Sequence, residues 1–174
     1  MNIAYTMAPG RGDTDMLLAG VARALLADGF KPAGTVQINT ERPGDHPCDM
    51  DVQVLPAGPV IRISQTLGAG ARGCRLDTSA LEDAVALVAA DLANGADCLI
   101  VNKFGKHEAE GRGFRPVIAD ALMRGIPVLV GINALNRDAF EAFTDGLAQF
   151  VSPDPLHIDA WLRGAISTPL AQTA

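Results

Sequence analysis

The sequence predicts an α/β fold in three layers: a mainly parallel sheet with helices on both faces and a short antiparallel hairpin. Apolar runs of strand length alternate with longer segments of helical period, which is typical of a parallel sheet with helical crossovers. Residues 98–101 are all apolar, as a strand covered on both faces should be. The 174 residues suit one core, so we expect a single domain over residues 1–166 and a flexible C-terminal tail over residues 167–174.

The first part of the chain predicts two strands and a helix. A strand over residues 3–7 leads through a glycine-containing turn into a helix over residues 13–28, whose apolar positions recur on one face. Gly29 favours the end of this helix because glycine adopts the left-handed conformation most easily. A second strand over residues 34–39 precedes a polar segment over residues 40–50 that we expect to be an exposed loop.

The next segment predicts a hairpin and a helix. Short alternating runs over residues 52–55 and 60–63 flank a Pro-Ala-Gly-Pro turn, which indicates an antiparallel hairpin or two edge strands. Further along, Thr78 and Ser79 offer N-cap oxygens to a helix predicted over residues 80–94.

The second half continues the alternation. The apolar strand over residues 98–101 is followed by a charged loop over residues 102–115. Pro116 suits the first turn of a helix that runs to Arg124, and the next central strand covers residues 126–132. The remaining predicted elements are a helix, a strand and a helix over residues 136–145, 148–151 and 156–163.

The composition excludes several classes of function. Twenty acidic residues against 14 basic ones give a net charge of −6, which argues against nucleic acid as a partner because such binding needs a cationic face. No apolar run approaches the ~20 residues that cross a bilayer, and the first residues lack the layout of a secretory signal. We therefore expect a cytoplasmic protein without membrane insertion. Its size and its hydrophobic edge strands are compatible with a homodimer.

The cysteines and histidines give no metal motif. Three cysteines without Cys-x-x-Cys spacing indicate neither a disulfide framework nor a zinc ribbon. One group of metal-ligand residue types fits no standard zinc spacing, so no metal site is predicted. That group consists of Asp45, His46, Cys48, Asp49 and Asp51.

Three loops are expected beyond the carboxyl ends of the parallel strands, where ligands bind in open α/β sheets: residues 8–15, 65–77 and 102–115. The first resembles a phosphate-binding P-loop, whose glycines let backbone amides surround phosphates before a Lys and a Ser or Thr. Thr14 has the expected place, but Asp13 stands at the lysine position. Two charges about 4 Å apart interact by about 4 kcal/mol at an effective dielectric of 20, so this exchange replaces an attraction by a similar repulsion.

A matching exchange occurs after the central strand. Small P-loop nucleoside triphosphatases end this strand with acidic residues that hold magnesium, whereas this chain has Asn102 and Lys103. Asp13 and Lys103 have thus exchanged the usual positions of acid and lysine. We hypothesise that they form an ion pair at the carboxyl edge of the sheet.

The third loop concentrates cations before a helix N-terminus, where a partial positive charge favours anions. Planar guanidinium groups in the second loop would add donors suited to an oxyanion. The candidate ligand-binding residues are Gly10, Arg11, Gly12, Asp13, Thr14, Arg72, Arg75, Asn102, Lys103, Lys106, Arg112 and Arg115.

Three motifs together carry a family resemblance. They are Gly10-Arg11-Gly12-Asp13-Thr14-Asp15, Leu67-Gly68 with Gly73-Cys74-Arg75-Leu76-Asp77, and Asn102-Lys103-Phe104-Gly105-Lys106 with Glu108, Glu110, Gly111, Arg112, Gly113 and Arg115. The chain resembles, over about residues 3–146, a bacterial family of unknown function that is related to small P-loop nucleoside triphosphatases. Genes of that family often lie beside molybdenum-uptake or nitrogenase genes. The resemblance implies a P-loop-like fold and a link to molybdenum metabolism, but no reaction.

We therefore expect a protein that binds a nucleotide or an oxyanion such as phosphate or molybdate at a degenerate P-loop, with little ordinary ATP hydrolysis. One alternative is an active magnesium-dependent nucleoside triphosphatase or phosphotransferase. In it Lys103 or Lys106 would replace the loop lysine, and Glu108 or Glu110 the magnesium carboxylates. A second alternative is a regulatory interaction protein with a vestigial pocket.

Overall fold

Seven strands form one sheet in the order β4-β3-β2-β5-β6-β1-β7. The structure is a computed structural model that describes residues 2–40, 49–65 and 75–167. The five strands β2, β5, β6, β1 and β7, in their spatial order, run parallel to their neighbours. At the other side of the sheet, β3 pairs antiparallel with both β2 and β4. The strands are β1 (Ile3–Thr6), β2 (Pro32–Thr40), β3 (Asp49–Leu55), β4 (Val60–Arg62), β5 (Cys98–Val101), β6 (Val128–Gly131) and β7 (Gln149–Phe150). The predicted mainly parallel α/β fold is confirmed.

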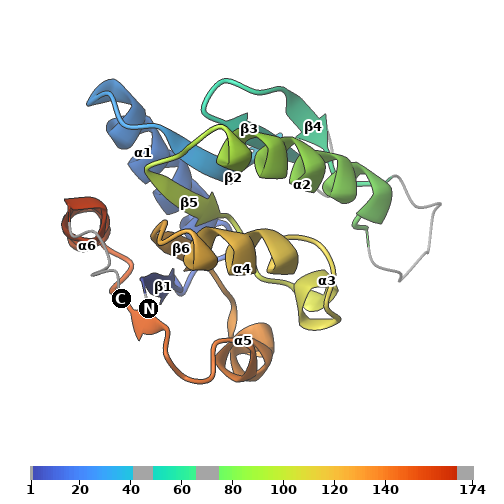
Figure 1. The fold of residues 1–174 in the computed structure, drawn as a ribbon. Coiled ribbons are helices and arrows are strands. Elements are labelled where there is room, and N and C mark those ends of the chain that lie inside the picture. Colours follow the sequence, from blue (N-terminus) through green and yellow to red (C-terminus); the bar gives the residue numbers. More distant parts are fainter. Residues whose placement is uncertain (1, 41–48, 66–74, 168–174) are drawn as a thin grey trace.

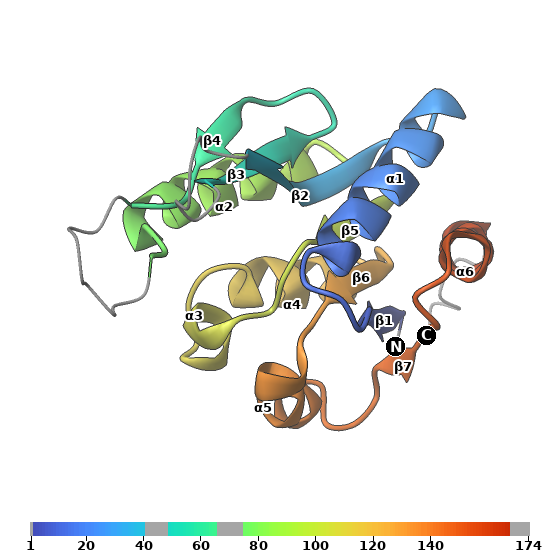
Figure 2. The same cartoon turned by 180° about the vertical axis from the view of Figure 1, so that it is seen from behind.

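Helices cover both faces of the sheet (Figure 1). One face packs against α1 (Asp13–Ala27) and α6 (Pro155–Ser167) through a core that includes Leu18, Leu25 and Ile100. The other face packs against α2 (Thr78–Ala93), α4 (Arg115–Met123) and α5 (Arg137–Phe143). The short helices α3 (Lys106–Ala109) and η1 (Ala134–Asn136) complete the set for the described residues. Figure 2 shows α1 and α6 from their own side of the sheet.

Most predicted elements are confirmed, because their periodicity comes from the face that each element buries. The strand at residues 3–7 is β1, the helix at residues 13–28 is α1, and the apolar run at residues 98–101 is β5, fully buried at all four positions. The predicted hairpin forms between β3 and β4.

Some boundaries differ from the predictions for local physical reasons. The predicted loop over residues 40–50 is too long, because β3 begins at Asp49 and continues the pairing with β2. Asp77, rather than Thr78 or Ser79, caps α2: its carboxylate accepts the N–H groups of Ser79 and Ala80 at 3.0 and 3.1 Å.

Several sequence predictions fall outside the described residues. Arg72 and three of the proposed metal-ligand types, Asp45, His46 and Cys48, lie in residues 41–48 and 66–74. Residues 168–174 of the predicted tail also lie outside the described residues. The first tail residue, Ser167, instead ends α6. Within the described ranges, no helix is long and apolar enough to cross a membrane.

Candidate functional site

The start of α1 lies beside the chain that leaves β5, at the carboxyl edge of the parallel strands (Figure 2). One strand, β6, separates β1 from β5 in the sheet. Gly131 ends β6 and allows this close approach: a Cβ added there would lie 2.2 Å from the carbonyl oxygen of Asn102 and 3.0 Å from Cγ2 of Thr14. The topology therefore brings the first and third predicted loops together.

The first loop leads into the N-terminus of α1, which no side chain caps. Gly12 is the N-cap of α1, with φ of 84° in the left-handed region that favours glycine, and no side chain accepts the first N–H groups of the helix. Thr14 Oγ1 instead accepts the N–H of Ala8 at 3.0 Å. In the described part of the chain, the N–H groups of Arg11, Gly12 and Thr14 have no acceptor.

The carboxylate of Asp13 folds back over this loop. A Cβ added to Gly10 would lie 2.1 Å from Asp13 Oδ2 and 2.6 Å from Cγ, so the carboxylate occupies the space above Gly10. The Asp13 carboxylate therefore lies against the loop glycine, although the residue as a whole is exposed.

Asn102 joins the two loops. Its side chain is buried, with 4% of the residue exposed. Its Oδ1 accepts the N–H of Gln37 at 2.9 Å, and its Nδ2 donates to Asp15 Oδ1 at 2.8 Å. This amide thus connects β2, β5 and the first turn of α1.

The hypothesised ion pair between Asp13 and Lys103 does not form. Both residues are described and exposed, and no salt bridge joins them to each other. The contact between the loops is made instead by their neighbours, Asn102 and Asp15. The sequence suggested the correct pair of loops and the wrong pair of side chains.

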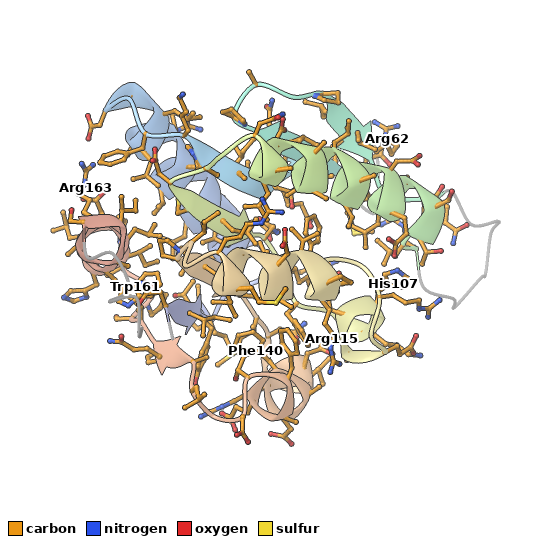
Figure 3. The ribbon with its side chains drawn as sticks, viewed as in Figure 1. Arg62, His107, Arg115, Phe140, Trp161 and Arg163 are labelled. Carbon is orange, nitrogen blue, oxygen red and sulfur yellow. The ribbon has the colours of Figure 1, made fainter. Side chains whose placement is uncertain are left out.

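The other cationic side chains that the sequence assigned to the ligand site do not converge on one site. Lys106 Nζ lies 3.7 Å from Glu110 Oε1, and Arg112 pairs with the same carboxylate. The Arg115 guanidinium lies over the Phe143 ring, 4.6 Å from its centroid, between α4 and α5 (Figure 3). Lys103 is exposed and has no partner in the part of the chain that the structure describes. Arg75 is half-buried just before α2.

Sequence reasoning missed that the third loop is a packed unit rather than only a charged surface loop. Glu108 is 3% exposed; its Oε2 accepts the N–H of Gly105 at 2.9 Å and its Oε1 that of Phe114 at 3.3 Å. The carboxylate therefore closes the turn of α3. A glutamate three residues after the N-cap is a capping signal that could have been recognised in the sequence.

A contact between the buried His107 and the exposed Glu82 joins this loop to α2. His107 is 6% exposed, and its Nε2 lies 2.6 Å from Oε1 of Glu82. The same oxygen accepts the N–H of Gly113 at 3.0 Å. Figure 3 shows His107 between α3 and the first half of α2. No local pattern links Glu82 to His107, because the contact depends on how α2 packs.

Removal of the Glu108 carboxylate should destabilise the fold. Glu108→Ala leaves the part-buried N–H of Gly105 and the buried N–H of Phe114 without acceptors, and we expect the free energy of unfolding to fall by about 2 kcal/mol. Urea denaturation measures this loss. Glu110→Ala is the matched control, because that exposed carboxylate makes only surface ion pairs and its loss should change stability much less. Equal losses in both variants would contradict this structural role for Glu108.

The Glu82 carboxylate should make folding sensitive to acid. Burial opposes its ionisation, but hydrogen bonds from His107 and Gly113 outweigh that effect and hold the pKa of Glu82 below its ordinary value of 4.5. The unfolded chain therefore binds more protons in the window below 4.5, and stability falls as the pH drops through it. Glu82→Gln should flatten this decline in urea unfolding between about pH 7 and about pH 3. An unchanged decline would assign the acid sensitivity to other carboxylates.

Among the described residues, the thiol of Cys98 is not a reactive group. Burial raises the pKa of the Cys98 thiol to about 12, so it stays protonated within β5. Among the residues that the structure describes, no three His, Cys, Asp or Glu side chains are grouped to hold a metal ion.

Known proteins share this sequence pattern and fold. A family described as "Protein of unknown function (DUF2478)" matches residues 3–161. Molybdenum import ATP-binding protein ModC 2 of Bradyrhizobium diazoefficiens is 37% identical over 165 residues, which are 95% of this chain and 18% of that protein. The chain thus spans less than a fifth of this relative. The solution structure of a human cancer-related nucleoside triphosphatase matches with a TM-score of 0.59 and 18% identity, over 100% of both chains.

Proposed function

Because the chain belongs to the DUF2478 family of proteins of unknown function, no reaction comes with its membership, and we propose from its structure that it binds a nucleotide or a small oxyanion at a degenerate P-loop. The observation that carries the proposal is the junction of β1 and α1. Its left-handed Gly12 suits an anion, and so do the N–H groups of Arg11, Gly12 and Thr14, which have no acceptor among the described residues. The fold shared with a nucleoside triphosphatase supports the same interpretation.

Ordinary ATP hydrolysis should be slow, because two usual components have changed. Asp13 stands at the position of the loop lysine, and Asn102 stands where a magnesium-holding carboxylate would follow β5. The amide of Asn102 is already engaged by Gln37 and Asp15. A neutral side chain held in this way cannot supply the negative charge that a magnesium ion requires.

The proposed setting is molybdenum metabolism. The supporting observation is the similarity to a segment of a molybdenum import ATP-binding protein. Molybdate and phosphate are both tetrahedral dianions, so the same backbone N–H groups and a nearby cation would suit either. Lys103, which is exposed two residues after β5 and has no partner among the described residues, is one candidate for this cation, and Arg11 in the first loop is another.

A panel of ligands tests the proposal. Thermal unfolding is followed with ATP, GTP, phosphate, sulfate, molybdate and tungstate, each with and without magnesium. A bound ligand stabilises the folded chain in proportion to the logarithm of its concentration over its Kd, so at least one member should raise the Tm. A chain that no member stabilises would be the regulatory interaction protein with a vestigial pocket.

An active magnesium-dependent enzyme is the second candidate, favoured by the free ammonium group of Lys103. It requires magnesium-dependent phosphate release that collapses in Lys103→Ala. The structure supports it less, because Glu108 is buried against backbone N–H groups and Glu110 is paired with Lys106 and Arg112. Neither carboxylate is therefore open toward a metal.

A further inference from the structure

The side chain of Asp13 lies where the proposed ligand would need space. Its carboxylate covers Gly10, next to the N–H groups of Arg11 and Gly12 that have no acceptor in the described part of the chain. Because a carboxylate and an incoming oxyanion carry the same sign, the two compete for this small region. Asp13 could either contact a bound ligand or occupy the place of the ligand when none is bound.

Three features of the junction favour a carboxylate that occupies the place of the ligand. No hydrogen bond or salt bridge within the described residues holds the Asp13 carboxylate, so little opposes its movement. The residue is exposed, and its flexible side chain can rotate toward solvent without disturbing the core. A negative charge in the first turn also interacts favourably with the helix dipole of α1, which an external anion would do equally well.

A buried hydroxyl beneath the same junction is a second, independent sign that a polar partner is missing there. Thr6 is fully buried, and its Oγ1 has no hydrogen-bond partner among the described residues. Thr6 pairs in register with Gly131, and a Cβ added to Gly131 would lie 3.0 Å from Thr14 and 2.9 Å from Leu18. Side chains at paired positions of neighbouring strands share a face, so Thr6 is directed toward the underside of the first turn of α1. A buried polar group without a partner is rare in folded proteins.

We propose that Asp13 acts as an internal anion that occupies the first loop and that any oxyanion or nucleotide must displace to bind. This inference rests on the proposed function, because it assigns a specificity-determining role to a residue of that same site. The consequence is selectivity: weak anions are excluded by the resident carboxylate, and only a ligand with further contacts binds. Lys103, exposed two residues after β5, is a candidate for such a contact.

Neutralisation of Asp13 tests the proposal. Isothermal titration calorimetry with ATP and with inorganic phosphate compares the unaltered chain with Asp13→Asn, which keeps the size of the side chain and removes its charge. We expect Asp13→Asn to bind at least about tenfold more tightly, which corresponds to one displaced charge interaction. Circular dichroism verifies that the variant folds, as the exposure of Asp13 leads us to expect.

Two control variants distinguish the effect of a charge at position 13 from the effect of the net charge of the protein. Asp91→Asn removes one negative charge from the last turn of α2, at the opposite edge of the sheet, and should change the Kd by less than about twofold. Asp13→Glu keeps the charge on a longer side chain and should bind no more tightly than the unaltered chain.

The outcomes distinguish this inference from the function on which it rests. Equal binding by the unaltered chain and by Asp13→Asn would overturn the internal-anion role and leave the proposed function standing. Weaker binding by Asp13→Asn, above all in the presence of magnesium, would make Asp13 a ligand contact and also overturn it. The absence of binding to either probe in all four proteins would overturn the internal-anion role, and the absence of any stabilising member in the ligand panel would overturn the proposed function as well.

Discussion

Gly34→Ala should abolish or severely weaken folding, because Gly34 occupies the centre of the sheet in a conformation open to glycine alone. Its φ is +121°, and an added Cβ would lie 1.8 Å from the carbonyl oxygen of Ile100 on β5. Neither the backbone strain nor the collision can be relieved without separating β2 from β5, which are paired there in register. Strain and overpacking contribute about 1–3 kcal/mol each, so we expect a loss of about 4 kcal/mol.

Urea denaturation of Gly34→Ala beside Gly20→Ala provides the measurement. Gly20 lies within α1 and has nothing within 4 Å of an added Cβ, so alanine there should stabilise the helix by up to about 1 kcal/mol. The two variants make the same chemical change with opposite expected signs. A loss below about 1 kcal/mol in Gly34→Ala would mean that β2 and β5 separate more easily than their pairing indicates.

The position of Gly34 also shows what the sequence could predict. The strand over residues 34–39 was recognisable from its apolar residues, and so were the neighbouring elements, because burial on one face leaves a periodic pattern. The order of the strands left no such pattern. That β2 lies between β3 and β5, and thereby joins the antiparallel part to the parallel part, follows from packing among distant segments.

The third loop was the least predictable part of the candidate site. Its charges are visible in the sequence, yet the structure separates them into different tasks: Glu108 closes a turn, His107 binds Glu82, and Arg115 stacks on Phe143. Each partner belongs to another turn or helix. Residue type and spacing therefore predicted a loop at the carboxyl edge, whereas the burial of His107 required knowledge of α2.

The first loop was better predicted, because its geometry is local. The strand, the glycines, Thr14 and the following helix determine the junction without help from distant residues, and Gly12 indeed begins α1 in the left-handed region. The orientation of the Asp13 side chain was not predictable in the same way. Sequence reasoning directed it to Lys103 because opposite charges attract, but exposed ion pairs gain little, and the carboxylate lies over Gly10 instead.

Asp13→Lys should cause the largest change in ligand binding that a single substitution can produce in this site. It removes a like charge and adds an opposite one at the position that corresponds, in the proposed function, to the lysine of a P-loop. At about 4 Å each of these two changes contributes from about 1 kcal/mol in water to about 4 kcal/mol at an effective dielectric of 20. Since Asp13 is exposed, we expect a sum of about 2–4 kcal/mol, and ATP should bind about 30-fold to 1,000-fold more tightly.

Hydrolysis should not follow the gain in affinity, and this difference makes the variant informative. Calorimetry with ATP measures the Kd of Asp13→Lys, and Asp91→Lys serves as the control for an equal change in net charge at the far edge of the sheet. Phosphate release should stay near background in both, because Asn102 still supplies no carboxylate and remains bound to Asp15 and Gln37. A Kd that changes by less than about threefold would place the ligand elsewhere than at this loop. Rapid hydrolysis would instead show that another carboxylate, such as Asp15, can hold magnesium once the lysine is present.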